Sequence, residues 1–341
     1  TTGVSNVLIG ALAGDALTDA DQNVAVGKNA LGSDTRGSTS TAIGHGSLAV
    51  QNFTTATNGY NTAVGYHSGV AVTTGLRNTI LGSLAGDALT DADDNVALGM
   101  DALSTDTLGS RSVAVGKGAL NVQNFTTATN THNTAVGYQA GTAVTTGIEN
   151  TLIGGLAGDA LTSAGNNTAL GAYALTTDTL GSKTTAIGNG ALFSQNFTTA
   201  TDSYNTAVGH AAGISVTTGT NNTLMGGLAG DAITTGNSNT LLGYNAGGAE
   251  STGSNNVIIG QAGQAQTLTS DTVAVGDGAL QTNTKSAKNT AIGRSALRVL
   301  NHTTATDAFN VAVGHSAGAA VTTGINNTLI GGGAGDALTD A

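Results

Sequence analysis

The 341-residue sequence contains no cysteine, no proline and no tryptophan, and charged residues make up only 9% of it. The absence of cysteine excludes disulfide bonds and thiolate metal sites. Because proline is absent, no residue along the chain is barred from donating a backbone hydrogen bond. Aromatic residues amount to 3%, which is unlike the core of an ordinary globular domain of this length.

Positive charge is also scarce. The net charge is −11, and the ten Lys and Arg residues are scattered instead of forming the basic patch that nucleic-acid binding requires. The chain has no run of 18 apolar residues, the length needed to cross a bilayer as a helix. We therefore expect neither a nucleic-acid partner nor insertion into a membrane.

What the sequence does have is 52 glycines and a repeat. The stretch "QNFTTATNGYNTAVGYHSG" at residues 51–69 returns from Gln123 and Gln195, and more loosely from Leu300, at intervals of 72, 72 and 105 residues. Aligned on the glycine that ends "NTAVG", the chain forms 19 units between Gly10 and Gly331. The steps between these glycines form a repeating cycle of four, in which the third step is longer than the others. This cycle makes up the 72-residue period, and two extra units in the last cycle, around Gly243 and Gly260, explain the longer interval.

Within each unit, apolar residues alternate before the glycine. The residue before the glycine is Val, Ile, Leu or Met, and the residue two positions earlier is Thr or Val. The position between them, on the opposite face of a short strand, is Ala in 12 units and Leu or Ile in the other seven. One face can fill the inside of a coil, so the other would remain as a long apolar stripe, which normally marks an interface.

These features predict an all-β fold, a parallel β-solenoid of about 19 coils of 17 or 21 residues, with residues 1–341 forming one continuous repeat region. Asn opens the strand in 15 units and Ser or Thr in the other four, which suits stacked amides at a turn. After the glycine we expect a tight corner and a second short strand. Residues 322–341 match residues 1–20 at 15 of 20 positions, which predicts a segment of a longer array.

Units such as "NTAVGYQAG" and "NTAIGRSAL" resemble the left-handed β-roll heads of trimeric autotransporter adhesins and the repeat regions of phage and marine-virus tail-fibre proteins. The resemblance covers all 19 units. It implies a left-handed solenoid, a homotrimer around a common axis, and a location outside the cell or on a virion. The units here are longer than those common in the adhesin heads.

The long coils hold a four-residue excess that predicts bulging surface loops. Rare aromatic and histidine residues gather there, either to contact sugars or other surfaces or to tuck under the loop as a local core. The candidate contact residues are Phe53, Tyr60, Phe125, His132, Phe197, Tyr204, His302 and Phe309.

Each long loop also carries an N-x-T triplet, at Asn52, Asn124, Asn196 and Asn301. Such triplets are formal glycosylation acceptors in a secretory host, or a coincidence of an Asn- and Thr-rich composition.

Two acidic segments, "GDALTDAD" at 14–21 and "GDALTDADD" at 86–94, could in principle bind calcium. Their 72-residue separation, unlike the nine-residue period of calcium repeats, favours solvated loops, and we expect no metal and no cofactor. The six histidines occupy positions that other units fill with unrelated residues, whereas catalysis needs one unique constellation. The sequence therefore predicts a protein that is not an enzyme.

The leading functional hypothesis is a structural and adhesive fibre protein, a rigid spacer and receptor-binding shaft of a virus tail fibre or extracellular appendage. Its partners would be identical chains, assembled sideways and also end to end, and host-surface glycans. The alternatives are an ice- or crystal-binding solenoid with an exposed Thr row, an extracellular filament subunit and, with little support, a polysaccharide hydrolase, for which no paired carboxylates are found on a strand.

Overall fold

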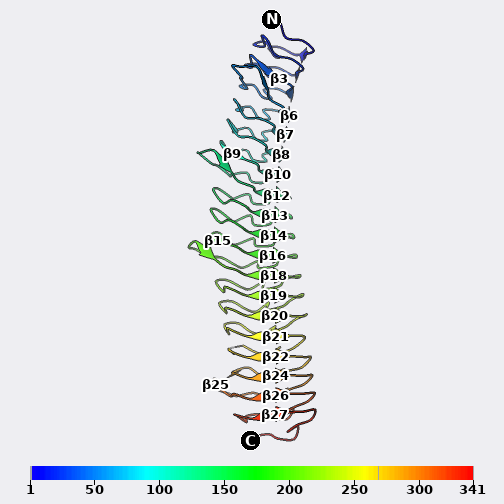
Figure 1. Ribbon diagram of the computed structural model, residues 1–341, viewed down its shortest axis with the longest axis vertical. Helices are drawn as coiled ribbons and strands as arrows, with labels where there is room; N and C mark the ends of the chain where they lie inside the picture. Colours follow the sequence, from blue (N-terminus) through cyan, green and yellow to red (C-terminus); the bar gives the residue numbers. More distant parts are fainter. Residues whose placement is uncertain (1, 268, 341) are drawn as a thin grey trace. The chain divides into compact units, whose positions relative to one another are not determined.

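The computed structural model describes residues 2–267 and 269–340. The chain divides into two compact units, Thr1–Asn167 and Thr168–Ala341. Each unit is a stack of coils in which a three-residue strand recurs once per coil, and the described residues contain no helix (Figure 1). The prediction of an all-β parallel solenoid of about 19 coils is confirmed. The expected coil lengths are seen in the strand pairing, which steps from Val24 to Thr41 in a short coil and from Thr41 to Thr62 in a long one.

The three-residue strands end just before the repeated glycines. In the first unit they are β1 (Val7–Ile9), β2 (Val24–Val26), β4 (Thr41–Ile43), β6 (Thr62–Val64), β7 (Thr79–Leu81), β8 (Val96–Leu98), β10 (Val113–Val115), β12 (Thr134–Val136) and β13 (Thr151–Ile153). In the second unit they are β14 (Thr168–Leu170), β16 (Thr185–Ile187), β18 (Thr206–Val208), β19 (Thr223–Met225), β20 (Thr240–Leu242), β21 (Val257–Ile259), β22 (Val273–Val275), β24 (Thr290–Ile292), β26 (Val311–Val313) and β27 (Thr328–Ile330).

Neighbouring strands within each unit pair in parallel and in register. β2 and β4, for example, align Val24 with Thr41 and Ala25 with Ala42. Because side chains alternate along a strand, the middle residue points into the coil and its two neighbours point out. The middle residue is buried in every coil except the first and the last, so a narrow interior column of Ala, Leu and Ile runs through each stack.

An asparagine ladder supports this column. Asn61, Asn78 and Asn95, which open successive strands, are buried, and the Oδ1 atom of each of the first two accepts the backbone N–H of the next asparagine at 2.9 and 3.0 Å. The Nδ2 atom of Asn61 donates to the Gly75 carbonyl of the next coil at 2.7 Å. The stacked amides thus satisfy both buried donors and buried acceptors, as the asparagine pattern predicted.

The structure differs from the sequence expectation after the glycine. Residues 28–33 form turns in place of a second strand, with Leu31 in the left-handed region at φ 50° and its side chain buried. In the described residues, additional strands occur only beside the long loops, as the parallel pairs β3 (Gly37–Ser38) with β5 (Thr57–Asn58), β9 (Gly109–Ser110) with β11 (Thr129–Asn130), β15 (Gly181–Ser182) with β17 (Thr201–Asp202), and β23 (Ser286–Ala287) with β25 (Thr306–Asp307).

Candidate functional site

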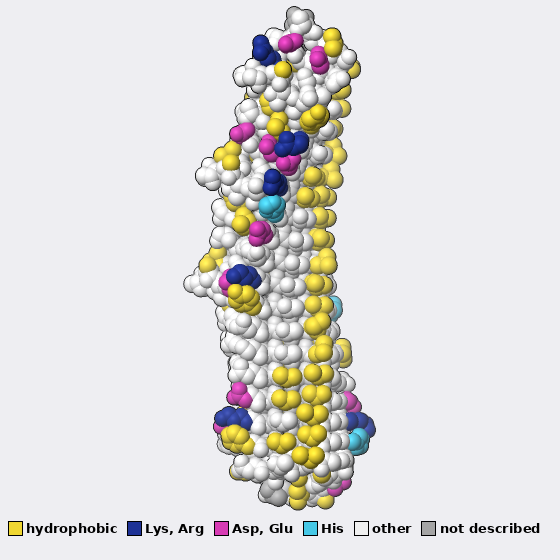
Figure 2. All heavy atoms as spheres, in the orientation of Figure 1, with side chains coloured by type: hydrophobic (Ala, Val, Ile, Leu, Met, Phe, Trp, Pro, Cys, Tyr) yellow, Lys and Arg dark blue, Asp and Glu magenta, His cyan; other side chains and the backbone are white. Residues whose placement is uncertain are grey.

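The outward face of the three-residue strands is apolar and open to solvent. Leu81, Leu170 and Met225, each just before a repeated glycine, keep 43%, 43% and 40% of their surface exposed. Figure 2 shows hydrophobic side chains in columns that run from coil to coil, across successive strands. The exposed stripe that the alternating pattern predicted is therefore present in the chain.

This face is large and uncharged. Both outward positions of every strand are Thr, Val, Ile, Leu or Met. Since a three-residue strand covers roughly 10 Å and coils repeat at about 4.8 Å, the described coils present roughly 430 Å² in the first unit and about 480 Å² in the second. Monomeric proteins rarely expose apolar patches above a few hundred Å². The areas are at the upper end of what a monomer exposes, about 300–600 Å², and the absence of charge at every coil gives the strand face the composition of an interface.

The long loops form the second candidate surface, and their first aromatic position is not part of it. Figure 1 shows β9 and β15, which pair with the loop strands β11 and β17, standing out from the side of the stacked strands. The first ring of each loop is buried: Phe53, Phe125, Phe197 and, in the fourth loop, His302. These four side chains pack under their own loops, which is the local-core alternative, and a binding partner cannot reach them.

The second aromatic position of each loop lies on the surface. Tyr60, Tyr204 and Phe309 are 57%, 53% and 51% exposed, and His132 is exposed as well. Lys183 Nζ lies 3.2 Å from the Tyr204 hydroxyl and 5.2 Å from the centre of its ring. Of the two aromatic positions in each loop, only the second, occupied by Tyr60, His132, Tyr204 and Phe309, is therefore open to a partner.

A buried carboxylate that sequence reasoning missed anchors three of the loops. Asp106 is fully buried, and its Oδ1 accepts the backbone N–H groups of Gly109 and Phe125, both at 3.0 Å. Its Oδ2 accepts Nε2 of Gln123 at 2.6 Å, and Oε1 of Gln123 accepts Nδ2 of Asn133 at 2.8 Å. Asp34 and Asp178 make the same contacts in their repeats, so each of these long loops is fixed to the interior of the stack.

The anchor belongs to an interior column formed by the residue seven positions after each glycine. This column repeats the order apolar, Asp, Gln, Val in the first three super-repeats: Leu17, Asp34, Gln51, Val72; Leu89, Asp106, Gln123, Val144; and Leu161, Asp178, Gln195, Val216. Nε2 of Gln51 donates to Oγ of Ser40 at 3.2 Å. Ser40 stands where most coils have the ladder asparagine. The glutamine thus supplies an amide to the coil that lacks one.

The fourth super-repeat departs from this order. Its two extra coils carry Glu250, seven positions after its glycine, and Gln266, six positions after Gly260 in a coil that is one residue shorter. The side-chain amide of Gln266 is buried and makes no hydrogen bond within the described residues. The Glu250 carboxylate accepts the Gly253 N–H and the Thr269 hydroxyl, both at 2.7 Å. Burial raises the pKa of Glu250, and the hydrogen bonds from Thr269 and Gly253 oppose this rise.

The loop asparagines of the N-x-T triplets are exposed or half-buried. In each, Oδ1 accepts a hydrogen bond from a threonine hydroxyl of the preceding coil, at 2.7 to 3.2 Å: Asn52 from Thr35, Asn124 from Thr107, Asn196 from Thr179 and Asn301 from Thr284. These hydrogen bonds involve Oδ1 of each asparagine, whereas glycosylation would modify Nδ2. Glycosylation at these four residues stays a prediction.

The acidic segments contact the neighbouring coil. Asp93 accepts the Leu76 N–H at 2.7 Å, and Asp94 accepts Nε of Arg77 at 2.6 Å. The hydrogen bond from Arg77 lowers the pKa of Asp94, while partial burial raises the pKa of Asp87. In residues 2–267 and 269–340 no three His, Cys, Asp or Glu side chains are grouped so that they could hold a metal ion.

Two of the histidines, His45 and His67, lie beside each other, with ring centres 5.3 Å apart. His45, His210 and His315 are exposed at the corners after their glycines, and His302 is buried. The ring of Tyr66 stacks against His67 at 4.1 Å and His45 at 5.5 Å between ring centres. This stack fixes ring positions but holds no nucleophile beside a base, and the absence of enzyme activity stays a prediction.

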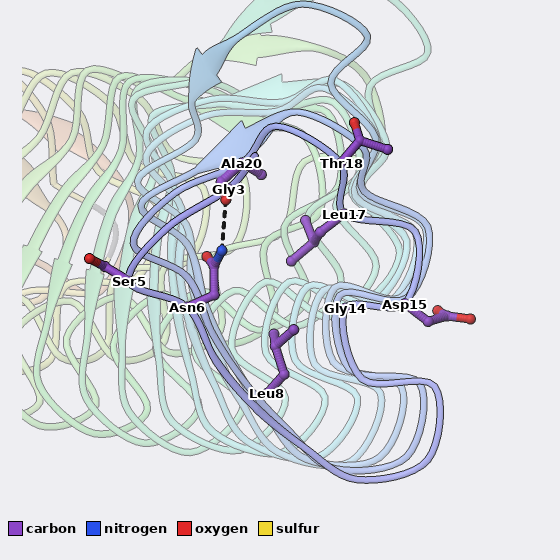
Figure 3. A pocket seen from close by; sticks show the side chains of 9 residues that line it. All are labelled: Gly3, Ser5, Asn6, Leu8, Gly14, Asp15, Leu17, Thr18 and Ala20. Atoms are coloured by element: carbon purple, nitrogen blue, oxygen red, sulfur yellow. Dashed lines mark hydrogen bonds between the residues drawn. The ribbon is translucent and has the colours of Figure 1, made fainter. Parts of the chain in front are cut away.

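A cavity of about 430 Å³ lies at the first coil (Figure 3). Leu8 and Leu17 point into it and Asp15 points away, while Asn6 Nδ2 donates to the Ala20 carbonyl at 2.7 Å. In later coils the equivalent space is filled by stacked side chains such as Leu89. The cavity is therefore the interior of the coil and has no separate binding chemistry.

The part of the chain that the structure describes includes no helix long and apolar enough to cross a membrane. Comparison with known proteins finds no matching family model and no matching curated protein. The features on which a function can be built are therefore the uncharged strand face and the four long loops.

Proposed function

We propose that this chain is a structural shaft that assembles side by side with identical chains through the outward strand face, as part of a fibre on a virion or another extracellular appendage. The observation that carries the proposal is the strand face itself. It is aliphatic or Thr at every coil, bears no charge and is half-buried or exposed in the single chain. Burying such a face removes apolar area from water at about 25 cal/mol per Å².

Identical chains are the partners that fit this face best. The face recurs at every coil, so a partner must present a matching surface with the same repeat along its whole length. A parallel copy of the same chain does so, because each of its strands lies at the same height as its counterpart. Three copies are supported by the resemblance of the "NTAVGYQAG" units to trimeric adhesin heads and tail fibres.

A shaft function also fits the rest of the surface. Each long loop is tied to the stack interior, by a buried Asp in the first three repeats, so it projects at a fixed place on a rigid support. Contact with host-surface glycans through the exposed parts of the loops is the adhesive half of the proposal. Its support is the exposure of Tyr60, Tyr204 and Phe309 beside Asn and Asp side chains.

Light scattering after size-exclusion chromatography tests the assembly. We expect three times the chain mass of 33.0 kDa. Val115→Asp places a carboxylate on the strand face of β10, and burying it unpaired in an assembly costs several kcal/mol, so the variant is expected to be monomeric. Thr126→Asp adds the same charge to an exposed loop position and is expected to leave the mass unchanged.

A monomeric parent protein would overturn the assembly. It would favour the alternative of ice or crystal binding, for which the exposed row that includes Thr62, Thr79 and Thr240 is the supporting observation. A mass that rises steadily with concentration would instead favour a filament subunit that joins end to end.

A further inference from the structure

Four coils carry a ring at both ends of the outward strand face. One ring lies two residues before the strand and the other two residues after it, with the glycine between. The four pairs are Tyr60 and Tyr66 at β6, His132 and Tyr138 at β12, Tyr204 and His210 at β18, and Phe309 and His315 at β26. In the other 15 coils these two positions never both carry rings.

Both rings of a pair lie on the same side of the coil as the strand face. The side chains of Asn61 and Ala63 are buried, whereas those of Thr62 and Val64 point outward by the alternation of the strand, and Tyr60, with its backbone in the left-handed region, is exposed directly before them. Tyr66 and Tyr138 are 52% and 53% exposed at the corner that follows. Each pair therefore brackets the apolar face at its two edges.

Several of these rings are held in place before any partner arrives. Asn58 Nδ2 lies 3.3 Å from the Tyr60 hydroxyl, and the Tyr66 ring packs against those of His45 and His67, which also contact each other. Lys288 lies 5.2 Å from the centre of the Phe309 ring. Side chains that are already ordered lose less conformational entropy on binding, which is typical of interface anchors.

We infer that, in the assembled shaft, the ring before the strand in one copy contacts the ring after the same strand in the neighbouring copy. This inference rests on the proposed side-by-side assembly of three copies. A rotation about an axis parallel to the stack keeps residues of the same number at the same height. When the strand faces turn to that axis, the leading edge of one face meets the trailing edge of the next.

These contacts set the axial register of the copies. With matched heights, Tyr60 meets Tyr66 of the next copy, and each of the other three coils brings a histidine against another ring. A slip by one coil keeps at most one ring contact, between Tyr60 and His45. The leading rings of the other three coils would then face Lys117, Asn189 and Arg294, or, after a slip in the other direction, glycines. The coil with Arg111 and Lys117 at the same two positions offers no such contact, since its long cationic side chains can turn outward to solvent.

The chain allows a direct test because Tyr60 and Tyr66 form the one pair in which two phenols meet. Photo-oxidation with a ruthenium complex and persulfate joins two tyrosine rings in contact through a carbon–carbon bond, with persulfate accepting the electrons. We expect covalent oligomers up to the trimer on a denaturing gel, and a Tyr60–Tyr66 linked peptide by mass spectrometry. Mixing ¹⁴N- and ¹⁵N-labelled chains shows that the link joins two copies.

Conservative variants supply the controls. Tyr60→Phe and Tyr66→Phe keep the ring but remove the phenol, so each is expected to keep the trimer mass and to lose the covalent oligomers. Tyr173→Phe removes a phenol that is 46% exposed and belongs to no pair, and is expected to change nothing.

Two results would overturn the inference in distinguishable ways. A trimer by light scattering that yields no Tyr60–Tyr66 link, or that cross-links equally well as Tyr60→Phe, would refute the ring contacts and leave the proposed assembly standing, with the rings free for a host surface. A parent protein that is monomeric by light scattering would refute both.

Discussion

Replacement of a single repeated glycine is the sharpest test of how the coils stack. Gly137 follows β12 at φ +143°, and a Cβ atom built there would lie 2.4 Å from the carbonyl oxygen and 2.6 Å from the carbonyl carbon of Gly154 in the next coil. An alanine must therefore push the two coils apart. Two backbone hydrogen bonds run beside the contact, from Gly137 N–H to Val115 and from Gly154 N–H to Val136, both 2.8 Å long.

The cost follows from these contacts. A non-glycine residue in this region of backbone space is strained by about 1–3 kcal/mol, and losing or stretching two hydrogen bonds adds about 2 kcal/mol. We expect Gly137→Ala to lower the free energy of unfolding by about 3–5 kcal/mol, measured by urea denaturation followed by circular dichroism. Hydrogen exchange should show that the loss of protection is greatest at the backbone amides of Gly137 and Gly154.

Gly155→Ala is the matched control. A Cβ at Gly155, which directly follows Gly154 in the next coil, would meet no atom within 4 Å. Its replacement should be neutral or should stabilise by about 0.4–1 kcal/mol, because alanine reduces the entropy of the unfolded chain. Equal stability of the two variants would show that the coils are not packed backbone to backbone at the repeated glycine.

Two further predictions concern the buried acids. Asp106→Ala leaves three buried N–H donors without their acceptor, at a cost of about 1–2 kcal/mol each, so the Phe125 amide should lose protection from hydrogen exchange. In Asp106→Asn, which keeps one oxygen, the same amide should lose less protection. Equal losses of protection in the two variants would contradict the network. The raised pKa of Glu250 means that its contribution to stability is complete below about pH 4 and is lost as the pH rises through the folded-state pKa. Glu250→Gln should therefore unfold at higher urea than the parent at pH 7 and at the same urea at pH 4, and an unchanged difference between the two pH values would refute the assignment.

The sequence predicted the stacked strands well because their pattern is local. Three residues before a glycine, as in Val24–Val26, alternate outward and inward within a single coil, and that alternation is visible without knowledge of any neighbour. The second strand expected after the glycine was wrong for a physical reason. Leu31 adopts a left-handed backbone there, and residues of its type give no sign that they will do so.

The loop anchors could not be predicted in the same way. Asp106 and Gln123 lie one coil apart along the chain, and only the stacking of coils brings them within 2.6 Å. In a chain rich in polar residues, an aspartate facing the interior looks like one facing water. The signal that could have found it is the order of residues seven positions after each glycine, where aspartate and glutamine alternate with Leu and Val at the period of the super-repeat. The burial of the loop rings could not be predicted either, because nothing in the local sequence distinguishes Phe53, which is buried, from Tyr60, which is exposed.

The ordered interior column restricts how the molecule can change its length. In the first three super-repeats an aspartate coil has a glutamine coil beside it. Deleting or duplicating one coil of such a pair would leave a buried carboxyl group without its amide partner, whereas gain or loss of a complete block of four coils leaves every interior neighbour matched. Such a block adds about 19 Å of stack at about 4.8 Å per coil and brings its own loop and its own pair of edge rings. The fourth super-repeat shows the cost of a different increment, since its two extra coils bring Glu250 and Gln266 into the column and the Gln266 amide makes no hydrogen bond within the described residues.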